Sequence, residues 1–154
     1  QRVHIAFVGR FHEQTAALAN KLGVAARVHT PGAVEPEQIV PFVRTADAAA
    51  LLYFAETENV HSILPNGFFQ SLSAELPLLY PDLPDIMQVI SCYKVGRQID
   101  PLNSQSLTQE INWMLDNAES MAKFSAELRL LADEASWQRE ETKLQALVAR
   151  VIGE

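Results

Sequence analysis

Residues 48–54 read Ala-Ala-Ala-Leu-Leu-Tyr-Phe, an unbroken apolar run between Asp47 and a polar loop at 55–65. A strand with one face in water alternates apolar and polar side chains, whereas a strand that helices cover on both faces is apolar throughout. The run therefore predicts a strand at the centre of a parallel sheet, with helices packed on both sides of it.

Strands and helices alternate on the N-terminal side of this run. Short β-favouring stretches end at Gly9 and at Gly32, and apolar residues at helical spacing, such as Leu18 and Leu22, follow them. The elements predicted here are a strand at 3–8, a helix at 15–22, a strand at 26–30 and a helix at 39–46.

The alternation continues on the C-terminal side and then gives way to helices alone. Pro77 and Pro81 flank a short strand, and Trp137 interrupts the helical region before its last helix. The elements predicted here are a helix at 66–75, strands at 76–80 and 93–99, a short helix at 84–91, a helix that begins after Ser104 or Ser106, a helix through Ala135, and a final helix with the stripe Leu144, Leu147, Val148 and Val151.

The order of these elements predicts an α/β fold, a doubly wound Rossmann-like parallel sheet in three α/β/α layers with a helical C-terminal tail. The chain has 154 residues, of which 48% are hydrophobic, so we expect a single domain over 1–154. Ligands of such sheets bind at the loops that follow the carboxyl ends of the strands. These loops are 9–13, 31–35, 55–66, 81–85 and 100–103.

The distribution of charge argues against a nucleic-acid partner. The formal net charge is -7, and the 12 Lys and Arg residues are scattered rather than gathered in a stripe. Binding to DNA or RNA depends on clustered cations that displace counterions from phosphates. We therefore expect no nucleic-acid partner.

Cysteine usage and hydropathy indicate the compartment. Cys92 is the single cysteine, so it cannot form an internal disulfide, and its apolar surroundings predict a small buried side chain. No apolar run approaches the ~20 residues needed to span a bilayer. Because the chain opens on Gln1 rather than Met, we read it as a fragment of a longer protein. We expect a cytoplasmic domain, or one that is peripheral at the inner membrane through the missing part.

Gly9 and Arg10 follow the first predicted strand and are candidates for a phosphate contact. A missing side chain lets a ligand approach the backbone, and a guanidinium pairs well with a phosphate. Neither a GxGxxG fingerprint nor a P-loop is present. An ordinary turn with a surface arginine explains the pair equally well.

Asn66 is placed to cap a helix at a strand-end crevice, where the first amides of the helix and its dipole favour an anion. A diphosphate fits such a place. The alternative is that Asn66 is only a cap and that Phe68, Phe69 and Leu72 are core residues.

The loop after the central run carries Glu56, Glu58 and His61, which are suited to contact sugar hydroxyls or to titrate near neutral pH. A solvated loop explains them equally well. No metal cofactor is predicted, because the histidines and the cysteine show no metal-ligand spacing. These residues are His4, His12, His29, His61 and Cys92.

Read in order, these segments resemble the C-terminal domain of GT-B glycosyltransferases, of the retaining group 1 type. The stretch ILPNGFFQSLSAELPLL at 63–79 carries most of the resemblance, with a proline, a helix start and a Leu-Pro before the next strand. The other matching segments are IAFVG at 5–9, LANKLGV at 18–24, VHTPGAV at 28–34, PEQIVPFVRTADAAALL at 36–52, VGRQIDPLNSQSLTQEINWMLDN at 95–117 and the Ser136-Trp137 pair.

The resemblance implies a domain that binds a nucleoside diphosphate sugar for hexosyl transfer to a hydroxyl acceptor, with surface polysaccharide as an expected product. It implies no metal, because a helix dipole and basic side chains neutralise the leaving group. It also implies an N-terminal acceptor-binding domain, which this chain lacks. The implied donor contacts are Gly9 and Arg10 for the phosphates, Gly32, Ala33 and Val34 for the base, Ser62, Ile63, Leu64, Pro65 and Asn66 for the diphosphate and sugar, Gln70 for the ribose, and Glu58 and His61 nearby.

The chain departs from the family pattern at several of these positions. Ser62 and Gln70 stand where retaining members often have two glutamates eight positions apart. Gly67 replaces a basic residue and Glu75 a small one, and the strand-helix unit that normally precedes Val3 is absent. No catalytic residue is therefore assigned, and a catalytically silent binding or scaffold domain stays open as an alternative.

Overall fold

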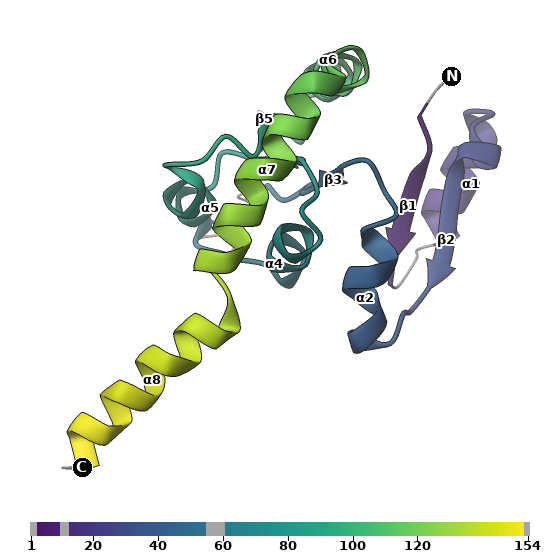
Figure 1. The fold of residues 1–154 in the computed structure, drawn as a ribbon. Helices are drawn as coiled ribbons and strands as arrows, with labels where there is room; N and C mark the ends of the chain where they lie inside the picture. The colour runs from purple at the N-terminus through teal and green to yellow at the C-terminus, as the bar shows by residue number, and fades with distance from the viewer. Residues whose placement is uncertain (1–2, 10–12, 55–60, 153–154) are drawn as a thin grey trace. The chain divides into compact units, whose positions relative to one another are not determined.

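The computed structural model describes residues 3–9, 13–54 and 61–152. Figure 1 shows the order of the elements along the chain. The elements are β1 (Ile5–Val8), α1 (Glu13–Lys21), the 3-10 helix η1 (Ala25–Arg27), β2 (Val28–Gly32), α2 (Pro36–Val43), β3 (Ala49–Ala50), α4 (Asn66–Ser73), β4 (Leu78–Tyr80), α5 (Pro84–Ile90), β5 (Gly96–Gln98), α6 (Ser104–Asp116), α7 (Ala118–Glu134) and α8 (Trp137–Ile152).

The chain divides into two compact units, Gln1–Ile39 and Val40–Glu154, and helix α2 spans the boundary. We call them unit 1 and unit 2 and describe each by itself. The single domain over 1–154 stays a prediction.

Unit 1 contains a parallel pair of strands, β1 and β2. Ile5 pairs with Val28 and Val8 with Gly32, and the register shifts between them. The amide of Gly9 donates a hydrogen bond of 2.8 Å to the carbonyl of Gly32. Both glycines have positive φ, 111° for Gly9 and 84° for Gly32, so each turn needs a residue without a Cβ.

Unit 2 contains a parallel three-stranded sheet in the order β3-β4-β5. Leu78 pairs with Ala49 and Gly96, so β4 lies between the other two strands. The predicted strand at 48–54 is shorter than expected, and among the described strands it lies at one end of this sheet rather than at its centre. The apolar run is half-buried here: Leu51 is buried, while Leu52 and Phe54 are exposed.

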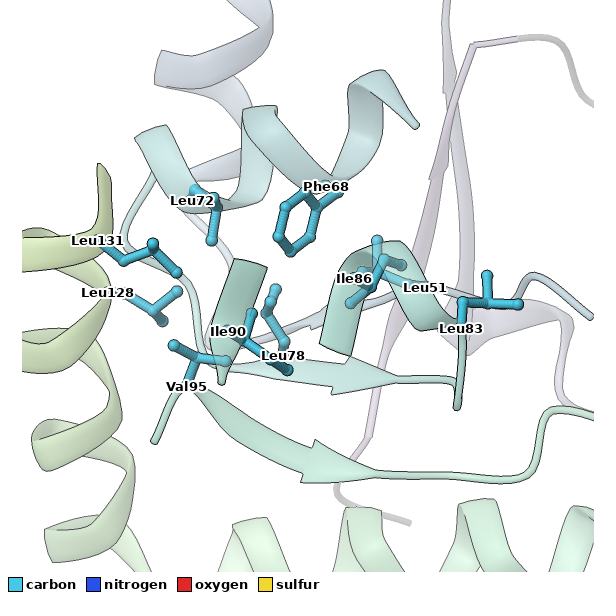
Figure 2. Close-up of a cluster of buried hydrophobic side chains, with 10 residues drawn as sticks. All are labelled: Leu51, Phe68, Leu72, Leu78, Leu83, Ile86, Ile90, Val95, Leu128 and Leu131. Carbon is cyan, nitrogen blue, oxygen red and sulfur yellow. The ribbon is translucent and has the colours of Figure 1, made fainter. Parts of the chain in front are cut away.

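Helices pack on both faces of β4, because successive side chains of a strand point to opposite faces. Leu78 lies in one hydrophobic cluster and Leu79 in another. Figure 2 shows the first cluster, in which side chains of α4, α5 and α7 meet those of the strands. Its buried members are Leu51, Phe68, Leu72, Leu78, Leu83, Ile86, Ile90, Val95, Leu128 and Leu131.

The second cluster packs α6 against the other face of the sheet. Leu79, Ile99 and Met114 are its buried members. Unit 2 therefore has helix, sheet and helix layers, and the predicted α/β class with parallel strands and a long C-terminal helix is confirmed.

Several caps and local environments differ from the predictions. Helix α6 is capped by Asn103, whose side chain accepts from the amides of Gln105 and Ser106, rather than by Ser104 or Ser106. The Cys92 side chain is exposed rather than buried. The helical region is interrupted at Ala135 and Ser136, and Trp137 is the first residue of α8, so the predicted break before the last helix is confirmed; α8 has no buried residue. Within the described residues, no helix is both long and apolar enough to cross a membrane.

Candidate functional site

A cleft of about 620 Å³ lies at the carboxyl ends of the three strands of unit 2. In open parallel sheets this edge is where ligands bind. The residues that line the cleft are Tyr53, Phe54, Pro81, Asp82, Leu83, Gln98, Ile99, Asp100, Pro101 and Leu102.

Helix α4 begins near the same edge, and its N-terminal cap is Pro65 rather than Asn66. Pro65 is extended (φ -73°, ψ 150°) and its carbonyl accepts from the amide of Phe68 at 2.9 Å. The prediction that Asn66 caps the helix is wrong, because the proline ring fixes an extended residue one position earlier and makes Asn66 the first helical residue. The cap residue Pro65 makes no side-chain hydrogen bond to the first amides of α4, and among the described residues no side chain accepts from them. These amides carry the positive end of the helix dipole.

Gly67 lies on the first turn of α4, next to Tyr53. Among the described residues, a Cβ built on Gly67 would meet the Tyr53 hydroxyl alone, at 4.0 Å. The start of α4 is therefore open to a side chain or a ligand, and Tyr53 joins it to the cleft.

The remaining candidates of unit 2 differ in exposure. His61, Ser62 and Asn66 are exposed, while Pro65 is buried. Ile63 packs against the hydrophobic core, and Leu64 is 37% exposed.

On α4, Gln70 is partly buried and lies one turn after Asn66. The prediction that Phe68 and Leu72 are core residues is confirmed, whereas Phe69, which was predicted with them, is exposed. Helix α4 is therefore anchored by its core residues and presents Asn66 on its other side.

The candidates of unit 1 lie on the two turns that follow its strands. Gly9 and Gly32 are joined by their backbone hydrogen bond, and Ala33 is exposed and Val34 half-buried just beyond β2. Arg10, Glu56 and Glu58 lie outside the described residues. The predicted donor contacts thus fall on both units.

Four polar residues of the cleft were not predicted as ligand contacts. Tyr53 was assigned to a strand, and Asp82 follows β4 where a turn was expected. Gln98 and Asp100 lie at the end of β5. The signal that identifies them is position, since each follows the carboxyl end of a parallel strand.

The side chain of Arg97 in β5 is engaged by two residues of α6. Its Nε donates to Glu110 at 2.5 Å, and its guanidinium lies 4.3 Å from the centre of the Trp113 ring. Burial raises the pKa of the nearby Tyr80 hydroxyl, and the charge of Arg97 opposes the rise. Arg97 is therefore a structural residue.

No metal-ligand cluster is evident in the part of the chain that the structure describes. There, no three or more His, Cys, Asp or Glu side chains are grouped so that they could hold an ion. The open amides of α4 and the polar rim of the cleft are the features suited to ligand binding.

No protein-family model and no curated protein sequence matches the chain. Three solved structures have the same fold. Sucrose-phosphate synthase from Thermosynechococcus elongatus matches with a TM-score of 0.80 at 12% identity, over 96% of this chain and 38% of that one. HepE from Anabaena, in complex with UDP, matches with a TM-score of 0.70 at 18% identity, over 94% and 41%. WaaG, a glycosyltransferase involved in lipopolysaccharide biosynthesis, matches with a TM-score of 0.68 at 20% identity, over 84% and 34%.

These matches define the class of fold. The chain has the fold of the nucleotide-sugar-binding, C-terminal half of GT-B glycosyltransferases, as the sequence predicts. It spans between 34% and 41% of the length of these three chains, which corresponds to one domain.

Proposed function

We propose that this chain is the donor-binding part of a glycosyltransferase that moves a sugar from a nucleoside diphosphate sugar to a hydroxyl acceptor. The observation that carries the proposal is the start of α4, where the cap Pro65 has no side-chain hydrogen bond to offer and no other described side chain accepts from the first amides. Such amides, with the helix dipole behind them, bind a diphosphate favourably. The fold supports the class, and the UDP bound to HepE makes a uridine nucleotide the first ligand to test.

The loop before α4 and two residues of the helix have roles in this proposal. Residues 62–66 contact the diphosphate and the sugar, and contacts of Glu58 and His61 with the donor stay predictions from the resemblance. Gln70 hydrogen-bonds a ribose hydroxyl, because it lies one helical turn from Asn66 and so shares a face with it. The helix dipole stabilises the leaving diphosphate without a metal. The roles of Gly9 and Arg10 at the phosphates and of Gly32, Ala33 and Val34 at the base stay predictions from the resemblance.

Titration calorimetry of the chain with UDP, GDP, ADP and their sugar conjugates tests the proposal. We expect selective binding of one nucleotide, and Gln70→Ala should weaken it roughly three- to tenfold, the effect of one hydrogen bond. Gln109→Ala, on the exposed surface of α6, is the matched control and should bind as the unmodified chain does. A folded chain that binds none of these nucleotides contradicts the proposal.

A catalytically silent binding domain is the second candidate. It is favoured by Ser62, Gly67 and Gln70, because none of them supplies the carboxylate or the cation that the resemblance leads one to expect. Measured affinity for nucleotides separates the two candidate functions. A donor-binding domain should bind a nucleotide, whereas a domain that serves only as a scaffold need not bind one. If the chain belongs to an active glycosyltransferase, we propose that the enzyme takes part in polysaccharide synthesis. The role of WaaG in lipopolysaccharide biosynthesis supports this proposal.

A further inference from the structure

The paired strands of unit 1 bring together two histidines from distant parts of the sequence. His29 in β2 pairs with Ala6 of β1, and His4 precedes Ala6 by two residues, so both histidines lie on the same face of the strand pair. They are 25 residues apart along the chain. Sequence spacing therefore gives no sign of this pair, which the parallel register of β1 and β2 creates.

The rings of His4 and His29 meet edge to edge. Nδ1 of His4 lies 2.8 Å from Nε2 of His29, so one nitrogen donates a hydrogen bond and the other accepts it. The ring centres are 5.1 Å apart and the ring planes differ by 13°, which together place the rings nearly in line rather than face to face. Two nitrogens, one from each strand, therefore face the same small space.

Both histidines are accessible to an ion from solvent. Both residues are exposed. Within the part of unit 1 that the structure describes, neither ring makes a hydrogen bond or ion pair with any residue except the other histidine. Neutral imidazole nitrogens are common ligands of divalent transition ions. To replace the shared hydrogen atom by such an ion, one of the two rings needs only to change its tautomer.

The distance between the two nitrogens favours one coordination geometry. Two nitrogens that bind an ion at about 2.0 Å and at right angles are about 2.8 Å apart, whereas a tetrahedral angle places them about 3.3 Å apart. The 2.8 Å between His4 and His29 matches the right angle. Tetragonal geometry with nitrogen ligands is typical of Cu²⁺ and Ni²⁺, and tetrahedral geometry is typical of Zn²⁺.

We propose that His4 and His29 form a binding site for a divalent transition ion of tetragonal geometry, Cu²⁺ or Ni²⁺, which links β1 to β2. Rotation of the two exposed side chains directs both lone pairs to a common ion, and water completes the coordination. Among the described residues of unit 1, Ala19 alone is buried, so a link between the strands adds stability that this small core does not supply. The inference does not depend on the proposed function.

Titration calorimetry of the chain with CuCl₂, NiCl₂ and ZnCl₂ tests the inference. We expect one ion per chain, and tighter binding of Cu²⁺ and Ni²⁺ than of Zn²⁺. His4→Gln and His29→Gln should each weaken Ni²⁺ binding at least about tenfold, because a ligand that binds at two points then binds at one. His61→Gln, which changes an exposed histidine of unit 2, is the matched control and should bind Ni²⁺ as the unmodified chain does.

Two further measurements locate the ion and its effect. Cu²⁺ at less than one equivalent should broaden the imidazole NMR signals of His4 and His29 before those of His61, because a paramagnetic ion broadens its ligands first. Ni²⁺ at saturation should raise the midpoint temperature of thermal unfolding of the unmodified chain but not that of His29→Gln, because an ion that binds the folded state stabilises it.

The opposite results overturn the inference. They are Ni²⁺ binding that neither His4→Gln nor His29→Gln weakens, equal weakening by His61→Gln, or equal broadening of all three imidazole rings by Cu²⁺. Zn²⁺ that binds more tightly than Ni²⁺ contradicts the right-angle geometry and the assignment of the ion. None of these measurements uses a nucleotide, so their failure is distinct from a failure of the proposed function.

Discussion

Glu75 has a backbone φ of 59°, in the left-handed region that non-glycine residues rarely occupy. Its carboxylate accepts from Arg129 at 3.0 Å (Nε) and 2.8 Å (Nη2). The strain costs about 1 kcal/mol, and a largely exposed ion pair contributes less than about 1 kcal/mol. Glu75→Gly should therefore change the free energy of unfolding by under about 1 kcal/mol, whereas Glu75→Ala keeps the strain, loses the pair and should be the less stable of the two. Urea unfolding compares them, and a glycine variant less stable than the alanine variant contradicts this account.

The same pair predicts a dependence on pH. The hydrogen bond from Arg129 lowers the pKa of Glu75 from its ordinary value of 4.5, against an opposing effect of burial. The stability that the pair contributes is thus fully present above about pH 4.5 and is lost as the pH falls through the lowered pKa. Urea midpoints of the unmodified chain and of Arg129→Met should differ at pH 7, and the difference should shrink as the pH falls below 4.5 and through the lowered pKa of Glu75. A difference that does not change with pH contradicts the prediction.

Strand β5 and helix α4 each contain a glycine, and the two positions differ in how much space they leave for a side chain. A Cβ on Gly96 would meet the backbone of Leu78 in β4 at 1.9 Å, whereas one on Gly67 would meet, among the described residues, just the Tyr53 hydroxyl at 4.0 Å. Gly96→Ala should lower the free energy of unfolding by at least about 2 kcal/mol, because β4 and β5 must separate. Gly67→Ala should leave it unchanged or raise it by up to about 1 kcal/mol through helix propensity. Thermal unfolding of both variants measures the contrast, and equal effects contradict it.

The helices and strands themselves could be predicted from the sequence, whereas the helix caps could not. Alternation of apolar runs and turn residues predicted the parallel strands and the helices between them, because those patterns are local. The positions of Pro65 as cap of α4 and Asn103 as cap of α6 were missed, since the neighbouring Asn66, Ser104 and Ser106 carry side chains of the kind that cap helices. The loops 81–85 and 100–103 were predicted as ligand loops, but the individual residues of the cleft were not assigned. They come together only through the sheet, and no spacing along the chain brings Tyr53 beside Asp100.

We expect the chain as a whole to bind the donor nucleotide without catalysing sugar transfer by itself. The chain spans at most 41% of the solved glycosyltransferase chains that it resembles in fold, and transfer requires donor and acceptor held together. We expect the isolated chain to release little or no UDP from UDP-glucose in the presence of oligosaccharides, measured by a coupled assay for UDP. Gln70→Ala serves as the control for any background. Sustained sugar transfer by the chain alone contradicts this expectation.

The central claim is that the open amides at the start of α4 bind the diphosphate of a nucleotide. The most direct measurement is an NMR titration of the 15N-labelled chain with UDP and, as the base-free probe, with pyrophosphate. The account predicts that both ligands shift the amides of Asn66 and Gly67 first and most strongly, and that uridine alone does not. Binding of UDP that leaves both amides unchanged, or no binding by either ligand, contradicts it.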